Sequence, residues 1–460
     1  MSKFSEKIRE RILTYDGSKG YLLQKAGLMG GECGEYWNLS KPEEVKKVYR
    51  AYIEAGSDVI QTNTFPGNLI NLSKYGKDFE KSMYEINFTG AQLALEVIAE
   101  MSGVSRSILV AGDIGPTSKL MKPSGDLDFN EAVNIFEKQV LALVDGGVDV
   151  INFETFSDLQ EMRAALIASK RIAPEIPVIC CLTFEQGGTT LMGDDPAAAA
   201  YVLAATGADV VGTNCSQGPD GLAGILSKMV AAWERNGSVP VARPAFCVKP
   251  NAGLPQVSAS GVVSYSESPS DFAAWIPAYT AVGARLIGGC CGASPEHVKA
   301  ISEAVRRVLP VSLPQRKNDN EKIAAVASSA RIIRFAEGSL PKPVDFFKEE
   351  WTYSNTLYKD LFIGDADSVI ERAVELMAED EKIIKLELDK IPSFDAIEPI
   401  ITITQAYNKK PIILKTDNPV YLQQALTLYN GVAGVVSSHL SESNRARQNE
   451  VASLFGCCIL

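Results

Sequence analysis

The chain has 460 residues, of which 46% are hydrophobic and 22% charged, and its formal net charge is −11. That length exceeds one ordinary domain, so we expect two. The negative charge argues against a nucleic-acid partner, because phosphate binding needs a basic surface. No apolar run is long enough to span a membrane and the N-terminus lacks a signal-peptide core, so we expect a cytoplasmic protein without a membrane partner.

Eight short runs typical of strands occur before residue 295, and each is followed by enough chain for a helix. In chain order they are ILTYDG, DVIQTNTF, ILVAGDIG, DVINFETF, PVICCLTF, DVVGTNCS, PAFCVKPN and RLIGGCC. Alternating strands and helices form right-handed parallel units. Eight such units predict an α/β fold, a closed (β/α)8 TIM barrel, which we place at residues 1–310.

One helix is plain in the segment SKPEEVKKVYRAYIEAG. Ser40 and Glu43 have the spacing of a capping box, and Gly56 is a typical helix end. Between them one apolar face is formed by Val45, Val48, Tyr49, Tyr52 and Ile53. The spacing therefore predicts an amphipathic helix that begins after Ser40.

A weak internal repeat aligns the second, fourth, sixth and eighth strands on a shared glycine, at Gly56, Gly147, Gly207 and Gly283. Seven residues later the chain has Asn63, Glu154, Asn214 and Cys290, and the next position has Thr64, Thr155, Cys215 and Cys291. Polar residues also end strands because loops begin there, but this explains a glutamate and three cysteines poorly. The repeat predicts polar and thiol groups at the C-terminal ends of alternate strands, where barrel active sites lie.

The chain has nine cysteines and only two histidines, His297 and His439. These counts limit the kinds of metal site and catalytic nucleophile that it can form. An odd cysteine count without a secretory signal argues against a disulfide framework. The shortage of histidine excludes most histidine-based metal sites and argues against Ser–His or Cys–His nucleophiles. A bound metal would therefore be held mainly by cysteine.

The cysteine pairs are not equivalent. Cys180 and Cys181 lie within an apolar strand, so we expect them to fill the core on opposite faces. Cys290 and Cys291 are instead surrounded by glycines, which let the backbone leave strand geometry so that both sulfurs can converge on one point with Cys215. Three thiolates with an open fourth position describe a catalytic zinc site. The alternative is a redox-active vicinal disulfide, which leaves Cys215 unexplained.

Zinc held by three thiolates can bind a substrate thiol and keep it as thiolate at neutral pH. A bound thiolate is a nucleophile that needs an electrophile. The sequence therefore favours methyl or alkyl transfer to sulfur.

These residues resemble a known family. GTNCSQGP followed by GGCCG is similar to the two cysteine motifs of the zinc-dependent homocysteine S-methyltransferases, and QTNTF, NFETF, TLMGDDP, KPNAGLP and SPEHV occur in the expected order. The resemblance covers residues 10–310 and is greatest to the homocysteine-binding barrel of cobalamin-dependent methionine synthases. It implies that Cys215, Cys290 and Cys291 are the catalytic zinc ligands.

The resemblance also implies a homocysteine site. Asp16 and Glu154 are expected to contact the amino group of L-homocysteine, since an ammonium in a dry barrel mouth needs a carboxylate. Gly17 would let the backbone approach the substrate. Asn63, at the end of its strand, is also expected to bind the substrate. Asn251 would occupy the open zinc position before substrate arrives, although turn formation alone also explains it.

Lys19 departs from the family pattern, which usually has an uncharged residue there. It could pair with the homocysteine carboxylate, indicate a different thiol substrate, or point to solvent.

The methyl donor is expected to be methylcobalamin or a related methylcorrinoid on a separate partner protein, because neither histidine fits the Asp-x-His-x-x-Gly signature of a cobalamin module. S-methylmethionine or another sulfonium or betaine-type donor is the alternative. Two further alternatives are methyl transfer to another thiol and a non-catalytic scaffold in a corrinoid methyltransfer complex.

Residues 311–328 are polar and predict a linker, and residues 329–460 predict a smaller α/β domain with about five strands. This domain faintly resembles the first half of the pterin-binding barrel of methionine synthases, but its opening Gly-Glu-Arg signature is not found, which argues against folate binding. An incomplete barrel leaves sheet edges to cover. We therefore expect this domain to pack on the first barrel or to mediate a homodimer.

Overall fold

The structure is a computed structural model, and two compact units can be distinguished in it. It describes residues 2–101, 103, 106–234, 241–253, 256–257, 263–308, 323–336, 339–345, 366–391, 393–436 and 442–460. Unit 1 comprises Met1–Met192, Gly207–Val230 and Pro244–Leu313, and unit 2 comprises Gly193–Thr206, Ala231–Arg243 and Pro314–Leu460. The break after Leu313 falls within the predicted linker, and unit 2 also takes in helix α10 (Pro196–Thr206).

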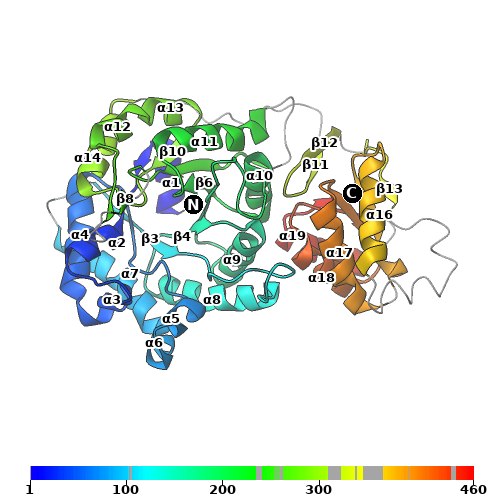
Figure 1. The fold of residues 1–460 in the computed structure, drawn as a ribbon, viewed down its shortest axis with the longest axis horizontal. Coiled ribbons are helices and arrows are strands. Elements are labelled where there is room, and N and C mark those ends of the chain that lie inside the picture. The colour runs from blue at the N-terminus through cyan, green and yellow to red at the C-terminus, as the bar shows by residue number, and fades with distance from the viewer. Residues whose placement is uncertain are drawn as a thin grey trace. The chain divides into compact units, whose positions relative to one another are not determined.

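Eight parallel strands form the barrel that the sequence predicts (Figure 1). Their order is β1-β10-β7-β6-β5-β4-β3-β2, and a bridge between Tyr15 and Val59 joins the first strand to the last. The strands are β1 (Leu13–Thr14), β2 (Val59–Gln61), β3 (Leu109–Ile114), β4 (Val150–Phe156), β5 (Val178–Leu182), β6 (Val210–Asn214), β7 (Ala245–Lys249) and β10 (Ala284–Ile287). The (β/α)8 fold is therefore confirmed.

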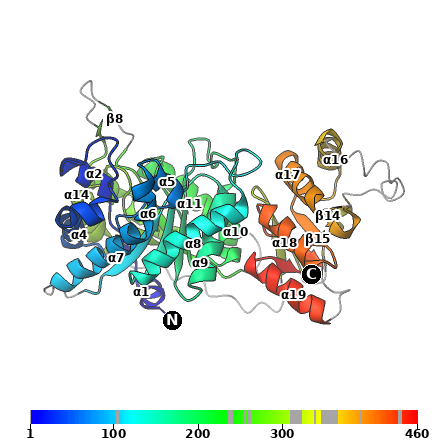
Figure 2. The same cartoon turned by 90° about the horizontal axis from the view of Figure 1, so that it is seen from below.

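Helices surround these strands, and α7, α8 and α9 lie side by side along one flank (Figure 2). The long ones are α4 (Pro42–Ala55), α7 (Met83–Glu100), α8 (Phe129–Asp145), α9 (Leu159–Ile172), α11 (Pro219–Glu234) and α14 (Pro295–Val305). The shorter elements are α1 (Lys3–Glu10), α2 (Lys19–Lys25), α3 (Trp37–Ser40), α5 (Leu69–Ser73), α6 (Lys77–Lys81), α12 (Pro269–Ala274), α13 (Ile276–Ala281) and the hairpin β8 (Gln256–Val257) with β9 (Val263–Ser264). No helix in the described part of the chain is both long and apolar enough to cross a membrane.

The predicted amphipathic helix is α4, and its apolar face is buried as expected. Its predicted start is wrong. The N-cap is Lys41, without a side-chain capping bond, and Ser40 is instead the last residue of α3. Pro42 at the first helical position sets the start, because its fixed φ suits that position and it lacks the N–H that would otherwise need a partner.

The four glycines of the repeat have one structural role. Gly56, Gly147, Gly207 and Gly283 have φ values of 109°, 88°, 107° and 98°. This left-handed conformation is easiest for glycine and ends the helix before each even-numbered strand of the barrel. The shared glycine therefore sets the distance to each strand end, as the repeat predicts.

The barrel interior is filled by short layers of side chains. Phe4 and Ile8 of α1 join the same buried cluster as Leu13, Val59 and Leu109, so α1 closes the N-terminal end of the barrel. Cys180 and Cys181 are both fully buried, as expected of core residues, and Cys181 belongs to the interior cluster.

Unit 2 contains a parallel sheet of five strands in the order β13-β14-β15-β16-β17. They are β13 (Val344–Asp345), β14 (Ile384–Glu387), β15 (Ile412–Lys415), β16 (Gly434–Val436) and β17 (Cys458–Ile459). The helical elements of its C-terminal part are α16 (Ala366–Ala378), η2 (Leu388–Lys390), η3 (Phe394–Ala396), α17 (Ile397–Tyr407), α18 (Pro419–Leu428) and α19 (Glu442–Leu454).

One strand of unit 2 differs from the prediction. The run SARIIRF forms β12 (Ile332–Ala336), which pairs antiparallel with β11 (Ile323–Ala327) and not with the five-stranded sheet. β11 lies within the predicted linker. A short turn joins the two strands, so local pairing competes with the parallel sheet. The first strand of that sheet is β13, a two-residue strand with no clear sequence pattern.

Candidate active site

Cys215 follows directly on β6, at a sharp turn of the backbone. Cys215 and Ser216 both have φ values of 63°, which residues other than glycine rarely adopt. Hydrogen bonds hold this turn, from Cys215 N to Lys249 O (3.1 Å) and from Gln217 N to Cys215 O (2.7 Å). Because the chain leaves extended geometry here, the direction of the Cys215 side chain no longer follows the alternation of side chains between the two faces of the sheet.

Glycines bring the chain after β10 close to its neighbours. A Cβ atom added at Gly288 would lie 2.6 Å from Tyr15 Cβ, and one at Gly289 would lie 2.2 Å from Ala293 Cβ. Gly292 has a φ of 76°. As the sequence predicts, these glycines permit a tight turn that two adjacent cysteines share.

The sulfur atoms of Cys215, Cys290 and Cys291 all lie within 4.8 Å of one another. Those of Cys215 and Cys291 are 3.7 Å apart, well beyond the length of a disulfide, about 2 Å. Two thiolates bound tetrahedrally to one zinc ion would lie about 3.8 Å apart. Among the described residues this is the one cluster of three potential metal ligands, and its spacing fits zinc.

The pKa values of the three thiols are also consistent with a cation site. Hydrogen bonds from the thiols of Cys290 and Cys291 lower the pKa of Cys215, and hydrogen bonds with Cys215 and Cys291 raise the pKa of Cys290. One thiolate therefore forms readily, and its charge opposes the next ionisation. A divalent cation between the sulfurs would remove that opposition.

Two asparagine side chains hold the cysteines. Asn251 Oδ1 accepts a hydrogen bond from Cys291 N at 3.1 Å. Asn214 Nδ2 donates to Cys290 Sγ at 3.5 Å and to Thr155 Oγ1 at 2.8 Å. The Asn251 oxygen, which is the atom that could bind zinc, thus already has a backbone partner.

Glu154 lies in β4 with its side chain 10% exposed. Its Oε2 accepts hydrogen bonds from Gln61 Nε2 (2.8 Å) and Asn152 Nδ2 (3.0 Å), and it forms an ion pair with Lys249. Burial alone would raise the pKa of Glu154, but Lys249 and Lys19 lower it. Glu154 is therefore an ionised carboxylate in a nearly dry site.

Asp16 follows β1 and is fully buried. Its Oδ2 accepts a hydrogen bond from Gln61 N at 2.8 Å, whereas its Oδ1 has no hydrogen-bond partner among the residues that the structure describes. Burial raises the pKa of Asp16 to about 7, although Lys19 opposes the shift. Asp16 Oδ1 is thus a buried acceptor without a donor among the described residues.

Lys19 is 9% exposed, and its Nζ lies 3.0 Å from Asp113 Oδ2. The alternative that Lys19 points to solvent is therefore wrong. Asp113 Oδ1 accepts a hydrogen bond from Asn152 Nδ2, which also donates to Glu154. The two buried ion pairs, Lys19–Asp113 and Lys249–Glu154, are linked through this one amide.

A cavity of about 390 Å³ opens at this end of the barrel. The predicted residues that line it are Gly17, Asn63, Glu154, Cys215, Cys290 and Cys291. Asp16 and Asn251 do not line it, but they adjoin it through Gly17 and Cys291. The cavity thus brings the cysteine cluster and the charged residues to one space.

Gly17 and Asn63 have structural contacts besides lining the cavity. A Cβ atom at Gly17 would lie 2.4 Å from Ala293 O, so the close approach there is between two backbone segments. Asn63 Nδ2 donates to Gly34 O (2.9 Å) and Asn38 Oδ1 (3.1 Å), which ties the loop after α2 to the barrel.

The sequence prediction missed Lys249, Asp113, Gln61 and Asn152. The repeat compared the even-numbered strands only. The odd-numbered strands, which lack the shared glycine, have Asp16 after β1, Asp113 in β3 and Lys249 at the end of β7. Charged residues at the ends of otherwise apolar strands were the available signal.

The chain is thus a (β/α)8 barrel protein with a cysteine cluster and buried charges at the C-terminal face, where the active sites of barrel enzymes lie. Residues 13–305 match the family model described as homocysteine S-methyltransferase. The chain belongs to the homocysteine S-methyltransferase family.

Similar proteins agree with this assignment. The chain is 31% identical over 345 residues to the methionine synthase of Mycobacterium leprae, an alignment that covers 72% of this chain and 27% of that protein. This chain thus spans little more than a quarter of that relative. Two structures of the homocysteine methyltransferase MmuM from Escherichia coli share the fold at 20% identity: the oxidized form (TM-score 0.53, 66% of this chain, 98% of that one) and the metallated form (TM-score 0.51, 64% and 96%).

Proposed function

We propose that the chain transfers a methyl group to the sulfur of L-homocysteine and so forms methionine, with zinc held by Cys215, Cys290 and Cys291. The observation that carries the proposal is the convergence of three sulfur atoms within 4.8 Å beside a cavity lined by Glu154 and Lys19. Membership of the homocysteine S-methyltransferase family supports it. A vicinal disulfide would leave Cys215 without a function.

Zinc bound by three thiolates would hold a substrate thiol as thiolate near neutral pH, below its ordinary pKa near 8.5. The chain's own residues then have three tasks: to hold the sulfurs, to bind the amino acid and to exclude water. Asn251 and Asn214 serve the first by bonding to the cysteine turns. We therefore assign Asn251 to positioning the cysteines. No histidine base is needed.

The charged residues suit a zwitterionic amino acid. Glu154 is ionised, and Asp16 Oδ1 has no partner among the described residues, so both can accept hydrogen bonds from the homocysteine ammonium. Lys19 lines the cavity and can share its charge between Asp113 and the homocysteine carboxylate. Leu23, Leu28 and Phe65 also line the cavity and would cover the methylene groups.

We propose a methylcorrinoid on a separate protein as the donor, because the similar proteins include methionine synthase and the barrel resembles its cobalamin-dependent forms. In the transfer, the homocysteine sulfur forms a bond to the methyl carbon while the donor keeps the electron pair of the broken bond. The product thioether is neutral and leaves.

The test is an anaerobic single turnover of zinc-loaded protein with homocysteine and methylcobalamin, with methionine detected by mass spectrometry. Cys291→Ala should abolish methionine formation. Cys457→Ala, which removes a thiol far along the sequence in unit 2, should not. Methionine from S-methylmethionine alone would change the donor but keep the acceptor, and methylation of cysteine in preference to homocysteine would change the acceptor. No product from a protein that carries one zinc ion would contradict the proposal.

A further inference from the structure

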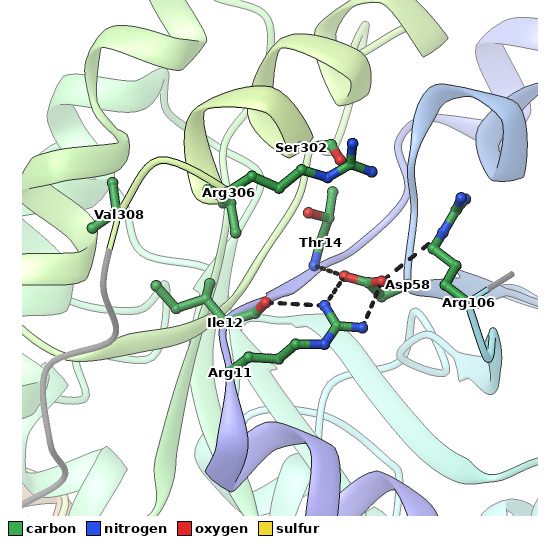
Figure 3. Close-up of a pocket in the computed structure, with 9 residues that line it drawn as sticks. Arg11, Ile12, Thr14, Asp58, Arg106, Ser302, Arg306 and Val308 are labelled. Atoms are coloured by element: carbon green, nitrogen blue, oxygen red, sulfur yellow. Dashed lines mark hydrogen bonds and ion pairs between the residues drawn. The ribbon is translucent and has the colours of Figure 1, made fainter.

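A second and larger cavity, of about 580 Å³, lies at the opposite end of the barrel. Ile12 and Asp58, which precede β1 and β2, are among the residues that line it, and this places it at the N-terminal end (Figure 3). The active-site proposal uses none of its residues. Its volume is in the range of small-molecule sites, about 300–1,000 Å³.

Three arginines from three separate elements line this cavity. Arg11 follows α1, Arg106 precedes β3, and Arg306 is the C-cap of α14. Figure 3 shows Arg11 and Arg106 beside Asp58 and Arg306 beside Ser302, and Asp58 is the one acidic residue among the described residues of the lining. Such a concentration of positive charge is unusual in a chain with a net charge of −11.

Asp58 is already used by the fold. Its Oδ2 accepts hydrogen bonds from Arg11 NH1 (2.8 Å) and Thr14 N (3.0 Å), and its Oδ1 accepts one from Arg11 NH2 (2.8 Å). This paired arrangement joins the beginnings of β1 and β2, and it explains Arg11 and Asp58 as structural residues. It does not explain the other two arginines.

Asp58 is at best a distant partner for Arg106, and Arg306 has no carboxylate partner among the described residues. Arg106 Nε lies 4.0 Å from Asp58 Oδ1, and the guanidinium donates to the backbone oxygens of Ser57 and Ile53. The Arg306 side chain has no hydrogen bond or ion pair with the described residues. Burial lowers the pKa of Arg106, Asp58 opposes this, and the charges of Arg306 and Arg11 lower it further. Repulsion among the arginines is therefore only partly compensated by Asp58.

We propose that this cavity binds a phosphate-type oxyanion between Arg106 and Arg306. Guanidinium groups bind phosphate through paired, charge-assisted hydrogen bonds, and an anion would remove the repulsion among the three arginines. The Ser302 hydroxyl, at the same wall, donates its hydrogen bond to Gly56 O, so the two guanidinium groups would supply the donors. The ligand is free phosphate or the phosphoryl group of a small metabolite, since the cavity has room for either.

The test is calorimetric titration of the full chain with inorganic phosphate and with glycerol 3-phosphate at constant ionic strength. We expect one saturable site per chain. Arg306→Gln should weaken binding at least tenfold, because Arg306 is exposed and its loss should leave the fold intact. Arg307→Gln is the matched control, since Arg307 is the next residue, also exposed, and does not line the cavity. Arg106→Lys, which keeps the charge and loses Nη1, the guanidinium nitrogen not bonded to the backbone, should also weaken binding.

Tighter binding of glycerol 3-phosphate would assign the site to a phosphorylated metabolite, and equal or weaker binding would assign it to free phosphate. No saturable binding of either, or equal losses in Arg306→Gln and Arg307→Gln, would overturn the proposal. Zinc content and methyl transfer are measured separately, so failure here leaves the proposed function untouched.

Discussion

Lys249 of β7 and Glu154 of β4 form a buried ion pair across the mouth of the barrel, with side chains 1% and 10% exposed. Lys249 Nζ also lies 4.4 Å from the centroid of the Tyr15 ring. Burial raises the pKa of Glu154, and the charge of Lys249 lowers it. The ionisation of Glu154, which we propose as an acceptor for the homocysteine ammonium, therefore depends on a lysine that does not line the cavity.

Lys249→Met should destabilise the chain by about 3 kcal/mol, because it leaves Glu154 buried without its partner. The double variant Lys249→Met/Glu154→Gln should recover most of this loss, since no uncompensated charge remains. Urea denaturation followed by tryptophan fluorescence measures both. Additive losses in the double variant would show that the two side chains do not interact.

Glu154→Gln should raise KM for homocysteine at least tenfold, which corresponds to a loss of about 1.4 kcal/mol or more of binding. Zinc content should stay at the wild-type value, because Glu154 does not contact the cysteines. Steady-state kinetics with elemental analysis tests this, and the exposed Glu185→Gln is the control. An unchanged KM would remove Glu154 from the substrate site.

Methionine binding should weaken as pH falls below about 7. Burial raises the pKa of Asp16 to about 7, so its carboxyl is ionised above this pH and protonated below it, and only the ionised form can pair with the ligand ammonium. Affinity should fall by up to about tenfold per pH unit below the pKa. Methionine is the suitable ligand because it carries the ammonium without a thiol that ionises.

Calorimetry of methionine binding between pH 8 and pH 5.5 provides the measurement. Asp16→Asn should bind methionine weakly and with little dependence on pH. If wild type and variant share the same pH profile, the titrating group is not Asp16.

Gly289→Ala should lower zinc affinity at least tenfold, because its Cβ would lie 2.2 Å from Ala293 Cβ and would displace the turn that carries Cys290. Gly187→Ala is the control, since a Cβ there meets no atom within 4 Å. Competition with a chromophoric chelator compares the two affinities. Equal affinities would mean that the turn tolerates the displacement.

Much of the site could be predicted because barrel topology places strand ends together. Counting from Gly56, Gly147, Gly207 and Gly283 correctly put Cys215 beside Cys290 and Cys291, although they are 75 residues apart in the chain. Lys249 was missed because a lysine after an apolar strand is usually solvent-exposed. Its burial depends on Glu154, a partner from another strand that spacing alone cannot reveal.

Local competition explains the remaining errors. Ser40 and Glu43 have capping-box spacing, but Pro42 takes the first helical position and moves the start of α4 to follow Lys41. β12 has the composition of a sheet strand, yet it pairs with the adjacent β11. In both cases a neighbouring residue or segment decides between two structures that the pattern allows equally.

The most direct test of the central claim is zinc content together with the number of sulfur atoms around the zinc, from elemental analysis and X-ray absorption of the wild type and Cys215→Ala. We predict one zinc ion per chain with three protein sulfurs at about 2.3 Å, a fourth sulfur when homocysteine is added, and weak zinc retention in the variant. A metal-free wild type with Cys290 and Cys291 joined as a disulfide, or equal zinc retention in Cys215→Ala, would contradict the account.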